Sequence, residues 1–331
     1  MEKERYNHLN KYLKEKFGER TLKICIDANF TCPNRDGKVG TGGCIFCSEK
    51  GSGEHLKPSE CLTHSSKSIS LEPSKSFNCS KNIKLITSSI QTQIRNHLNS
   101  YRGERANNFI AYFQNYTNTY DSLENLKARY DAALIDDRIA CLAIATRPDC
   151  IDEDICKLIA SYKNKVDVWV ELGLQTANDE TGKYINRGYS SKEFTEAVKL
   201  LNKYDIESVA HIIVGLPGET IEDIKNTVTF INSHNIQGLK IHSCYVIDNT
   251  VLGEMYKSGN YTPITLEYYL ETASYVLTHI NPQIIIHKVS GDAPKDLLLA
   301  PEWNLHKKWI MNGLDKLLKE KNLYQGMYYK K

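Results

Sequence analysis

Three cysteines in one glycine-rich loop constrain this chain more than any other feature of its sequence. They are Cys32, Cys44 and Cys47, separated by eleven and then by two residues. The intervening proline, asparagine, aspartate and glycine residues permit tight turns, so the thiols can reach a common point. Converging thiolates bind a soft metal ion or an iron–sulfur cluster. The loop therefore predicts a metal centre.

Two kinds of metal centre fit the loop. A structural zinc site needs four ligands, and Cys25 or His55 could supply the fourth. A cluster held by three thiolates instead leaves one iron open to another molecule. Cys-x-x-Cys also occurs in redox pairs and in half of a zinc ribbon, so the loop alone leaves both possibilities open. We interpret Cys25 as a core thiol, because it lies on the strand predicted before the loop.

The composition is that of an ordinary globular protein. Among 331 residues, 41% are hydrophobic and 25% are charged, with a formal net charge of +2. The first residues lack an apolar signal core, and no apolar run is long enough to span a bilayer. We therefore expect a cytosolic protein with no membrane partner. In that reducing compartment, ten cysteines favour metal binding or buried thiols over disulfides.

Positive charge gathers near both ends of the chain. Residues 305–331 carry seven lysines and two acidic residues, and residues 1–25 carry seven basic and four acidic residues. Basic segments of this kind can contact RNA phosphates. Solvated helix faces are the simpler interpretation of either segment by itself.

Beyond the loop, strand-like and helix-like segments alternate. Predicted strands cover residues 22–27, 108–114, 139–146, 166–173, 208–214 and 239–246. Predicted helices cover residues 2–16, 83–101, 122–134, 152–161, 191–204, 219–234 and 303–321. Strands rich in valine and isoleucine between helices predict a parallel sheet covered by helices. Six such units favour an open, partial (β/α)6 relative of the (β/α)8 barrel, and residues 282–289 could add a further strand.

The domain organisation follows from the same pattern. We expect an N-terminal helix in residues 1–20, a core barrel in 21–250 and a C-terminal extension in 251–331 that covers the barrel. Residues 63–82 are rich in Ser, Lys and Asn without periodicity, which predicts a flexible insertion. Four metal-ligating residues in or beside it are too irregularly spaced for a second metal site to be favoured. They are His55, Cys61, His64 and Cys79.

In a parallel barrel, the working face lies at the carboxyl ends of the strands. The polar residues at the predicted strand ends are therefore candidates for a site, beside the cysteine loop. They are Gln114 with Tyr116 and Asn118, Thr146 to Asp149, Glu171 with Gln175, His211, and Lys240 with His242. Lys240 and His242 are two residues apart and face the same way. That direction is either the barrel interior, where such groups indicate function, or the outer surface.

Taken together, these segments resemble the radical S-adenosylmethionine (SAM) superfamily, and within it the YhcC/YtqA-like proteins, relatives of the Elongator-type and coproporphyrinogen dehydrogenase radical SAM domains. The similarity covers nearly the whole chain except the insertion. It is carried by Cys32–Gly37 with Gly43–Cys47, Tyr112–Tyr120, Ala145–Asp149, Glu171–Thr176, Gly215–Thr220, Lys240–His242, Gly291–Pro294 and Ala300–Trp303. Most members separate their first two cysteines by three residues, whereas this subgroup shares the longer gap.

The resemblance implies a barrel of the radical SAM type in which Cys32, Cys44 and Cys47 hold a [4Fe-4S] cluster. SAM would bind the open iron through its amino and carboxylate groups. The implied SAM contacts are Phe46 near adenine, Gln175 and Arg187 at the ribose and methionine carboxylate, Glu171 in support, and Ile213 and Val214 along adenine. Phe113-Gln-Asn115 stands where other members have Gly-Gly-Glu, which makes Gln114 a further cofactor-binding candidate.

The implied activity is reductive cleavage of SAM to a 5′-deoxyadenosyl radical that abstracts hydrogen from a substrate. Tyr116, Lys240 and His242 are the candidate catalytic residues. Relatives suggest tRNA as partner, with remodelling of a wobble uridine, and a flavodoxin or ferredoxin as reductant. The alternatives are a radical enzyme acting on a small metabolite and a zinc-bound, non-catalytic RNA-binding protein.

Overall fold

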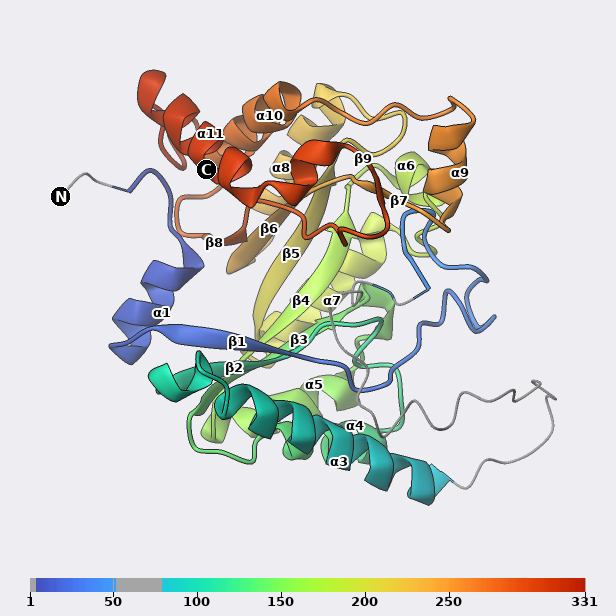
Figure 1. The fold of residues 1–331 in the computed structure, drawn as a ribbon, viewed down its shortest axis with the longest axis vertical. Helices are drawn as coiled ribbons and strands as arrows, with labels where there is room; N and C mark the ends of the chain where they lie inside the picture. The colour runs from blue at the N-terminus through green and yellow to red at the C-terminus, as the bar shows by residue number, and fades with distance from the viewer. Residues whose placement is uncertain (1–3, 50, 52–78, 331) are drawn as a thin grey trace.

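The computed structural model describes residues 4–49, 51 and 79–330. Seven parallel strands form one curled sheet in the order β1-β2-β3-β4-β5-β6-β8 (Figure 1). Their bounds are β1 (Thr21–Ile26), β2 (Asn108–Phe113), β3 (Ile139–Thr146), β4 (Asp167–Gln175), β5 (Glu207–Val214), β6 (Gly238–Ser243) and β8 (Ile285–Lys288). Sequential strands lie side by side, which confirms the open, partial barrel with β8 as the additional strand.

Helices cover the outer face of this sheet (Figure 1). They are α3 (Cys79–Leu98), α4 (Leu123–Ala133), α5 (Glu153–Ala160), α7 (Ser191–Lys203), α8 (Ile221–Asn232) and α10 (Leu266–His279). Side-chain caps determine where several of these helices begin. Capping boxes pair Ser190 with Glu193 before α7 and Thr220 with Asp223 before α8.

The alternation of side chains along the strands divides the core into two parts. On β2, Phe109 and Phe113 face the helices and belong to the large outer core, whereas Ile110 and Tyr112 face the barrel interior. Helix α1 (Leu9–Phe17) closes one end of this interior, because Leu9 and Leu13 pack in the same cluster as Ile110. The polar residues of β3 to β6 that face the interior lie toward the other end.

The C-terminal part packs against the barrel. Helix α11 (Lys307–Glu320) lies beside α10 and buries Ile310, Leu314 and Leu318. A two-stranded antiparallel ribbon joins β7 (Val246–Ile247) to β9 (Leu298–Ala300). Two short helices complete the fold, α6 (Asp179–Tyr184) and α9 (Val251–Lys257).

The structure differs from the sequence-based expectation in several places. Helix α1 begins at Leu9 rather than residue 2, because the chain before it runs beside β8. The strand expected in 239–246 ends at Ser243, and Val246 pairs with β9 instead. Helix α10 was not predicted, since its tyrosine, threonine and valine residues have modest helix propensity. Helix α3 begins at Cys79, before residue 83, where that helix was expected.

One prediction and one possibility that the sequence did not favour fall largely outside the described residues. They are the flexible insertion, apart from the backbone of 79–82 in α3, and the second metal site with His55, Cys61 and His64. The boundaries expected between the domains remain predictions. Among the described residues, no helix combines the length and apolar character needed to cross a bilayer.

Candidate functional site

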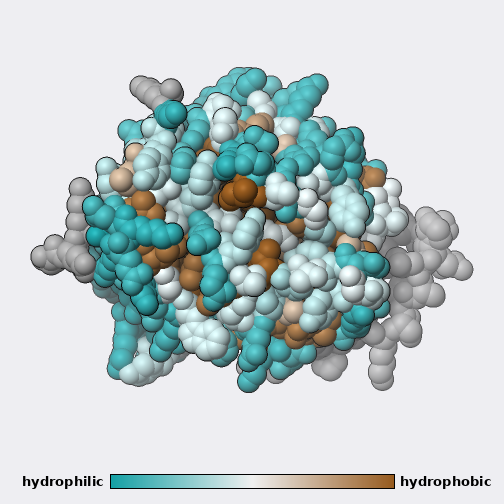
Figure 2. Space-filling view, turned by 90° about the horizontal axis from the view of Figure 1, so that it is seen from above, coloured by the Kyte–Doolittle hydropathy of each residue, from teal (hydrophilic) through white to brown (hydrophobic). Residues whose placement is uncertain are grey.

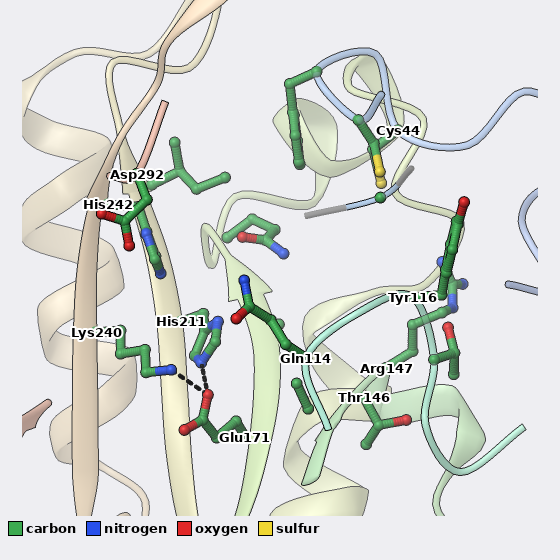
Figure 3. A pocket seen from close by; sticks show the side chains of 18 of the residues that line it. Cys44, Gln114, Tyr116, Thr146, Arg147, Glu171, His211, Lys240, His242 and Asp292 are labelled. Carbon is green, nitrogen blue, oxygen red and sulfur yellow. Dashed lines mark hydrogen bonds and ion pairs between the residues drawn. The ribbon is translucent and has the colours of Figure 1, made fainter. Parts of the chain in front are cut away.

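A cavity of about 530 Å³ lies inside the barrel and is lined by residues from all seven strands of the sheet. The cysteine loop supplies another part of its wall. In Figure 3, Cys44 lies on one side of the open space, and Glu171, His211, Lys240 and His242 lie on the opposite side. The strand-end residues and the loop therefore face one common space.

The three loop cysteines all line this cavity, and none forms a disulfide. Arg35 fixes the loop, because its guanidinium donates to the backbone oxygen of Cys47 at 2.9 Å and also to that of Ser48. Burial and the neighbouring Cys47 raise the pKa of the Cys44 thiol to about 12. Among the described residues, no three His, Cys, Asp or Glu side chains meet at the separation of a single bound metal ion.

Glu171 is the centre of a buried hydrogen-bond network on β4. Its Oε2 accepts from Tyr112 Oη at 2.6 Å, from His211 Nε2 at 2.9 Å and from the Lys240 ammonium group. Its Oε1 accepts from Trp169 Nε1 at 3.1 Å. The Glu171 side chain is 0% exposed, so these partners replace water completely.

Burial and neighbouring charges shift the protonation of this network. Burial alone would raise the pKa of Glu171, but Lys240, Lys23 and His211 bring it well below its usual value. Burial lowers the pKa of Lys240 to about 7, although Glu171 opposes that shift. Burial and the Lys240 charge lower the pKa of His211 to about 4, so its imidazole is neutral at pH 7 and donates Nε2–H to Glu171.

A second group of titratable side chains adjoins this network. His242 lies with its ring centroid 5.3 Å from that of His211, and burial lowers its pKa well below the usual value. Lys288 on β8 forms an ion pair with Asp292, which also pairs with Lys307 at the start of α11. Lys240 and His242 thus face the barrel interior, which decides between the two directions that the sequence left open.

Five of the expected cofactor contacts line the cavity: Phe46, Gln114, Glu171, Gln175 and Ile213. Gln175 has a positive φ of 65° at a break in the register of β4 and β5. A Cβ atom at Gly173 would lie 2.7 Å from Gln175 Nε2 and 3.2 Å from Tyr189 Oη. A larger residue at position 173 would therefore displace the Gln175 amide from its present place.

Arg187 and Val214 are not among the residues that line the cavity. The guanidinium of Arg187 is fully buried and donates to the backbone oxygens of Leu174 and Thr176, both at 2.6 Å, and to Asp179 at 2.9 Å. Val214 packs in the outer core. The structure therefore does not bring these two predicted SAM contacts to the cavity.

Tyr116, the third candidate catalytic residue, lines the cavity and donates its hydroxyl to the backbone oxygen of Glu49. The structure also adds residues that the sequence did not single out. Lys23 and His287 line the cavity from β1 and β8. In the sequence, only the alternation of side chains along β1 and β8 could have indicated these two residues. Strand β8 has four residues, too few to show which of its side chains face the barrel interior.

Arg147 lies on the cysteine side of the cavity (Figure 3). It forms a bidentate pair with Asp149, at 2.9 and 2.7 Å, and donates to the backbone oxygen of Arg187 at 2.9 Å. The Arg-Pro-Asp segment was among the expected strand-end residues. The structure shows that its arginine, rather than Arg187, has its charged group at the cavity wall.

The family of the chain follows from its sequence relatives. The family model of the radical SAM superfamily matches residues 36–231, and that of the radical SAM C-terminal domain matches residues 236–320. YtqA of Bacillus subtilis is 32% identical over 99% of this chain and 94% of its own length. YhcC of Escherichia coli is 30% identical over 93% of this chain and 90% of its own. The chain belongs to the radical SAM superfamily.

More distant relatives share parts of the chain. A tRNA uridine(34) acetyltransferase of Methanocaldococcus infernus is 30% identical over 49% of this chain and 30% of that protein. The solved structure of the M. infernus protein Elp3 has a TM-score of 0.59 at 21% identity, covering 72% of this chain and 60% of that one. This structural likeness concerns the fold.

Family membership makes the chain a radical SAM enzyme, whose cofactors are a [4Fe-4S] cluster and SAM. The donor set of the cavity fits both groups. Three thiols on its wall that form no disulfide match a cluster with one open iron. Phe46, Ile213 and the amide of Gln175 combine apolar surface with polar groups, as a nucleoside pocket requires.

Proposed function

We propose that Cys32, Cys44 and Cys47 hold the cluster and that SAM lies along Phe46, Gln175 and Ile213. When bound, the reduced cluster and SAM supply methionine and a 5′-deoxyadenosyl radical that abstracts hydrogen from the substrate. The observation that carries this proposal is the shared cavity, which the cysteine loop and the strand-end residues line together. A substrate in the cavity would lie between the cofactors and the Glu171 network.

Three side chains are our candidates for contact with the substrate: Tyr116, Lys240 and His242. All line the cavity, and Lys240 and His242 come from the wall opposite Cys44 (Figure 3). We add Arg147 to the residues proposed to lie beside SAM. Arg187 is instead proposed to hold the loop that follows β4. A flavodoxin or ferredoxin in a reducing cytosol would supply the electron.

A wobble uridine of tRNA is the proposed substrate. Support comes from the relative named for tRNA uridine(34) and from lysines at the cavity rim, where Lys307 of α11 pairs with Asp292. Lys316 and Lys319 on α11 and Lys321 just after it extend this positive charge, although Glu320 and Asp315 pair with the first two.

The cofactor proposal is tested with protein purified without oxygen. Wild type should be brown, contain about four irons per chain and release deoxyadenosine when given dithionite and SAM. Cys47→Ser should lose iron and deoxyadenosine release, whereas Cys150→Ser, a free thiol outside the cavity lining, should keep both. Colourless wild-type protein with zinc and no iron would establish the zinc alternative.

The substrate proposal is tested by comparing tRNA nucleosides from cells with and without the gene. A wobble uridine that changes only when the gene is removed supports it, and unchanged nucleosides point to a small metabolite instead. For tRNA binding, Lys316→Glu with Lys321→Glu should weaken affinity, while Lys199→Glu on α7 should not. Deleting α11 would not be informative, because it would expose Ile310, Leu314 and Leu318.

A further inference from the structure

The cavity wall formed by β1, β6 and β8 carries more positive than negative groups. Lys23, Lys240 and Lys288 face it from these three strands. The carboxylates beside them that line the cavity are Glu171 and Asp292. Lys240 is buried and Lys23 and Lys288 are half-buried, and an excess of ammonium groups in such a partly desolvated wall is unfavourable unless an anion accompanies it.

Both carboxylates are already engaged. Glu171 accepts hydrogen bonds from four side chains, including Lys240. Asp292 pairs with Lys288 and also with Lys307 at the rim, so one negative charge faces two positive ones. Including Lys307, four lysines share two carboxylates around this wall.

Lys23 is the lysine of this wall that lacks an ion-pair partner among the described residues. Among the described residues, it has no carboxylate within ion-pair distance, and its ammonium lies 4.3 Å from the centre of the Tyr112 ring. The ammonium of Lys240 lies 4.5 Å from the centre of that ring. The two cations thus approach one aromatic ring, and their repulsion favours an anion between them.

Two imidazoles on the same wall add unused hydrogen-bonding capacity. The Nδ1 atom of His287 is buried and has no hydrogen-bond partner in the described part of the chain. The side chain of His242 likewise forms no hydrogen bond to another described residue, and its ring lies beside that of His211. Neutral imidazoles can each donate one N–H to an anionic oxygen.

We propose that this wall, made of Lys23, Lys240, Lys288, His242 and His287, binds an anionic oxygen group of the substrate, a carboxylate or a terminal phosphate. The inference rests on the proposed function, in which SAM occupies the cysteine side and leaves this side for the substrate. Helix α1 closes the barrel end with Leu9 and Leu13. A phosphodiester with chain on both sides therefore cannot pass this wall, so in a tRNA substrate the anion would be a carboxylate on the base. A terminal phosphate would belong to the small-metabolite alternative.

The test measures anion binding to the cluster-loaded protein with SAM present. Acetate and inorganic phosphate are titrated separately by calorimetry at constant ionic strength. Lys23→Met and Lys288→Met remove one charge each from the wall at nearly constant length. Lys23→Arg retains the charge, and Lys199→Met removes an exposed charge on α7 as the matched control.

We expect saturable binding of at least one anion by wild type, about tenfold weaker binding by Lys23→Met and Lys288→Met, and little change in Lys23→Arg and Lys199→Met. Tighter binding of acetate identifies a carboxylate, and tighter binding of phosphate identifies a phosphate. No saturable binding by wild type, or equal affinity in Lys23→Met and Lys199→Met, overturns the proposal. If Lys23→Met loses iron or helical content, the anion affinity of Lys288→Met is compared with that of Lys199→Met instead, and equal affinities overturn the proposal.

The binding measurement is separate from SAM cleavage. Wild type that binds acetate but releases no deoxyadenosine would refute the proposed function and leave the anion-binding wall in place. Wild type that cleaves SAM but binds neither anion would refute the anion-binding wall alone.

Discussion

At the scale of single residues, Glu171 holds the barrel interior together. Its carboxylate is inaccessible to water and serves four donors from β2, β4, β5 and β6. Removing its charge would leave the Lys240 ammonium buried at 4% exposure without a nearby anion. The cost of breaking a buried ion pair from one side exceeds the net contribution of the intact pair.

We expect Glu171→Gln to lower the free energy of unfolding by about 3 kcal/mol, because Lys240 loses its counter-charge. Urea unfolding of the variant and of Glu196→Gln, an exposed glutamate on α7, measures the difference. Adding Lys240→Met to Glu171→Gln should recover part of the loss, since the unpaired charge is then gone. A loss below about 1 kcal/mol would contradict the network's role in stability.

Glu219, in the turn before α8, predicts a pH dependence of stability. Both of its carboxylate oxygens are buried, and burial raises the pKa of the carboxyl group to about 7 against the opposing effect of the nearby Thr176 and Thr181 hydroxyls. The folded protein then holds a proton that the unfolded chain releases near pH 4.5. The contribution of Glu219 to the free energy of unfolding is therefore greatest below about pH 4.5 and decreases as the pH rises toward 7.

Glu219→Gln should remove this slope. The variant should be more stable than wild type by about 2 kcal/mol at about pH 8, after allowance for solvent screening, and similar at about pH 4.5. Urea midpoints at several pH values test this, with Glu222→Gln on the exposed side of α8 as control. Equal slopes in Glu219→Gln and wild type would show that the carboxyl group titrates normally.

At the scale of elements, the loop that follows β4 depends on one buried arginine. Arg187 binds backbone oxygens of Leu174, Thr176 and Tyr189 and pairs with Asp179 at the start of α6. These bonds hold the end of β4, where Gln175 enters the cavity with a positive φ. The arginine thus positions the end of the strand.

Arg187→Met should lower the free energy of unfolding by about 3 kcal/mol, because four acceptors, two of them in buried hydrogen bonds, lose their donor. Arg20→Met, an exposed arginine before β1, should change it by less than about 0.5 kcal/mol. Unfolding in urea compares the two. A variant with unchanged stability but much weaker SAM binding would instead favour the SAM contact that the family resemblance implies.

The alternation of side chains along β6 predicted which residues share a face, but not whether that face is turned to the barrel interior or to the surface. Lys240 and His242 share a face by sequence, but only the pairing with Glu171 shows that this face is internal. Arg187 was placed at the cofactor by resemblance, and its bonds to Leu174 and Thr176 depend on a loop path that no local pattern specifies. The cysteine loop was accessible to prediction because glycine and proline determine its turns locally.

At the scale of the whole molecule, the surface and the two chain ends complete the open barrel. Figure 2, a view from above, shows small separate brown areas between teal side chains rather than one broad apolar face. The gap between β1 and β8 is bordered by the segment before α1, where Ile286 N donates to Asn7 O at 2.8 Å. Tertiary contacts between distant ends thus take the place of a further barrel strand.

Gln325 links these distant segments. Its Oε1 accepts from Asn7 N at 2.8 Å, its Nε2 donates to Ile284 O at 2.7 Å, and its backbone N donates to Arg5 O at 2.8 Å. The residue is 8% exposed, so its side-chain bonds are shielded from water. The C-terminal tail therefore holds the segment before α1 against the edge of β8.

Gln325→Ala should lower the free energy of unfolding by about 2 kcal/mol, because the part-buried Asn7 N–H and the buried Ile284 carbonyl lose their partners. Hydrogen exchange at the Ile286 amide should accelerate, since that amide donates to Asn7 O in the released segment. Gln283→Ala, at an exposed position beside β8, should leave both quantities unchanged. Faster exchange throughout the sheet, rather than at its β8 edge, would show that Gln325 supports global stability and not the closure of the barrel.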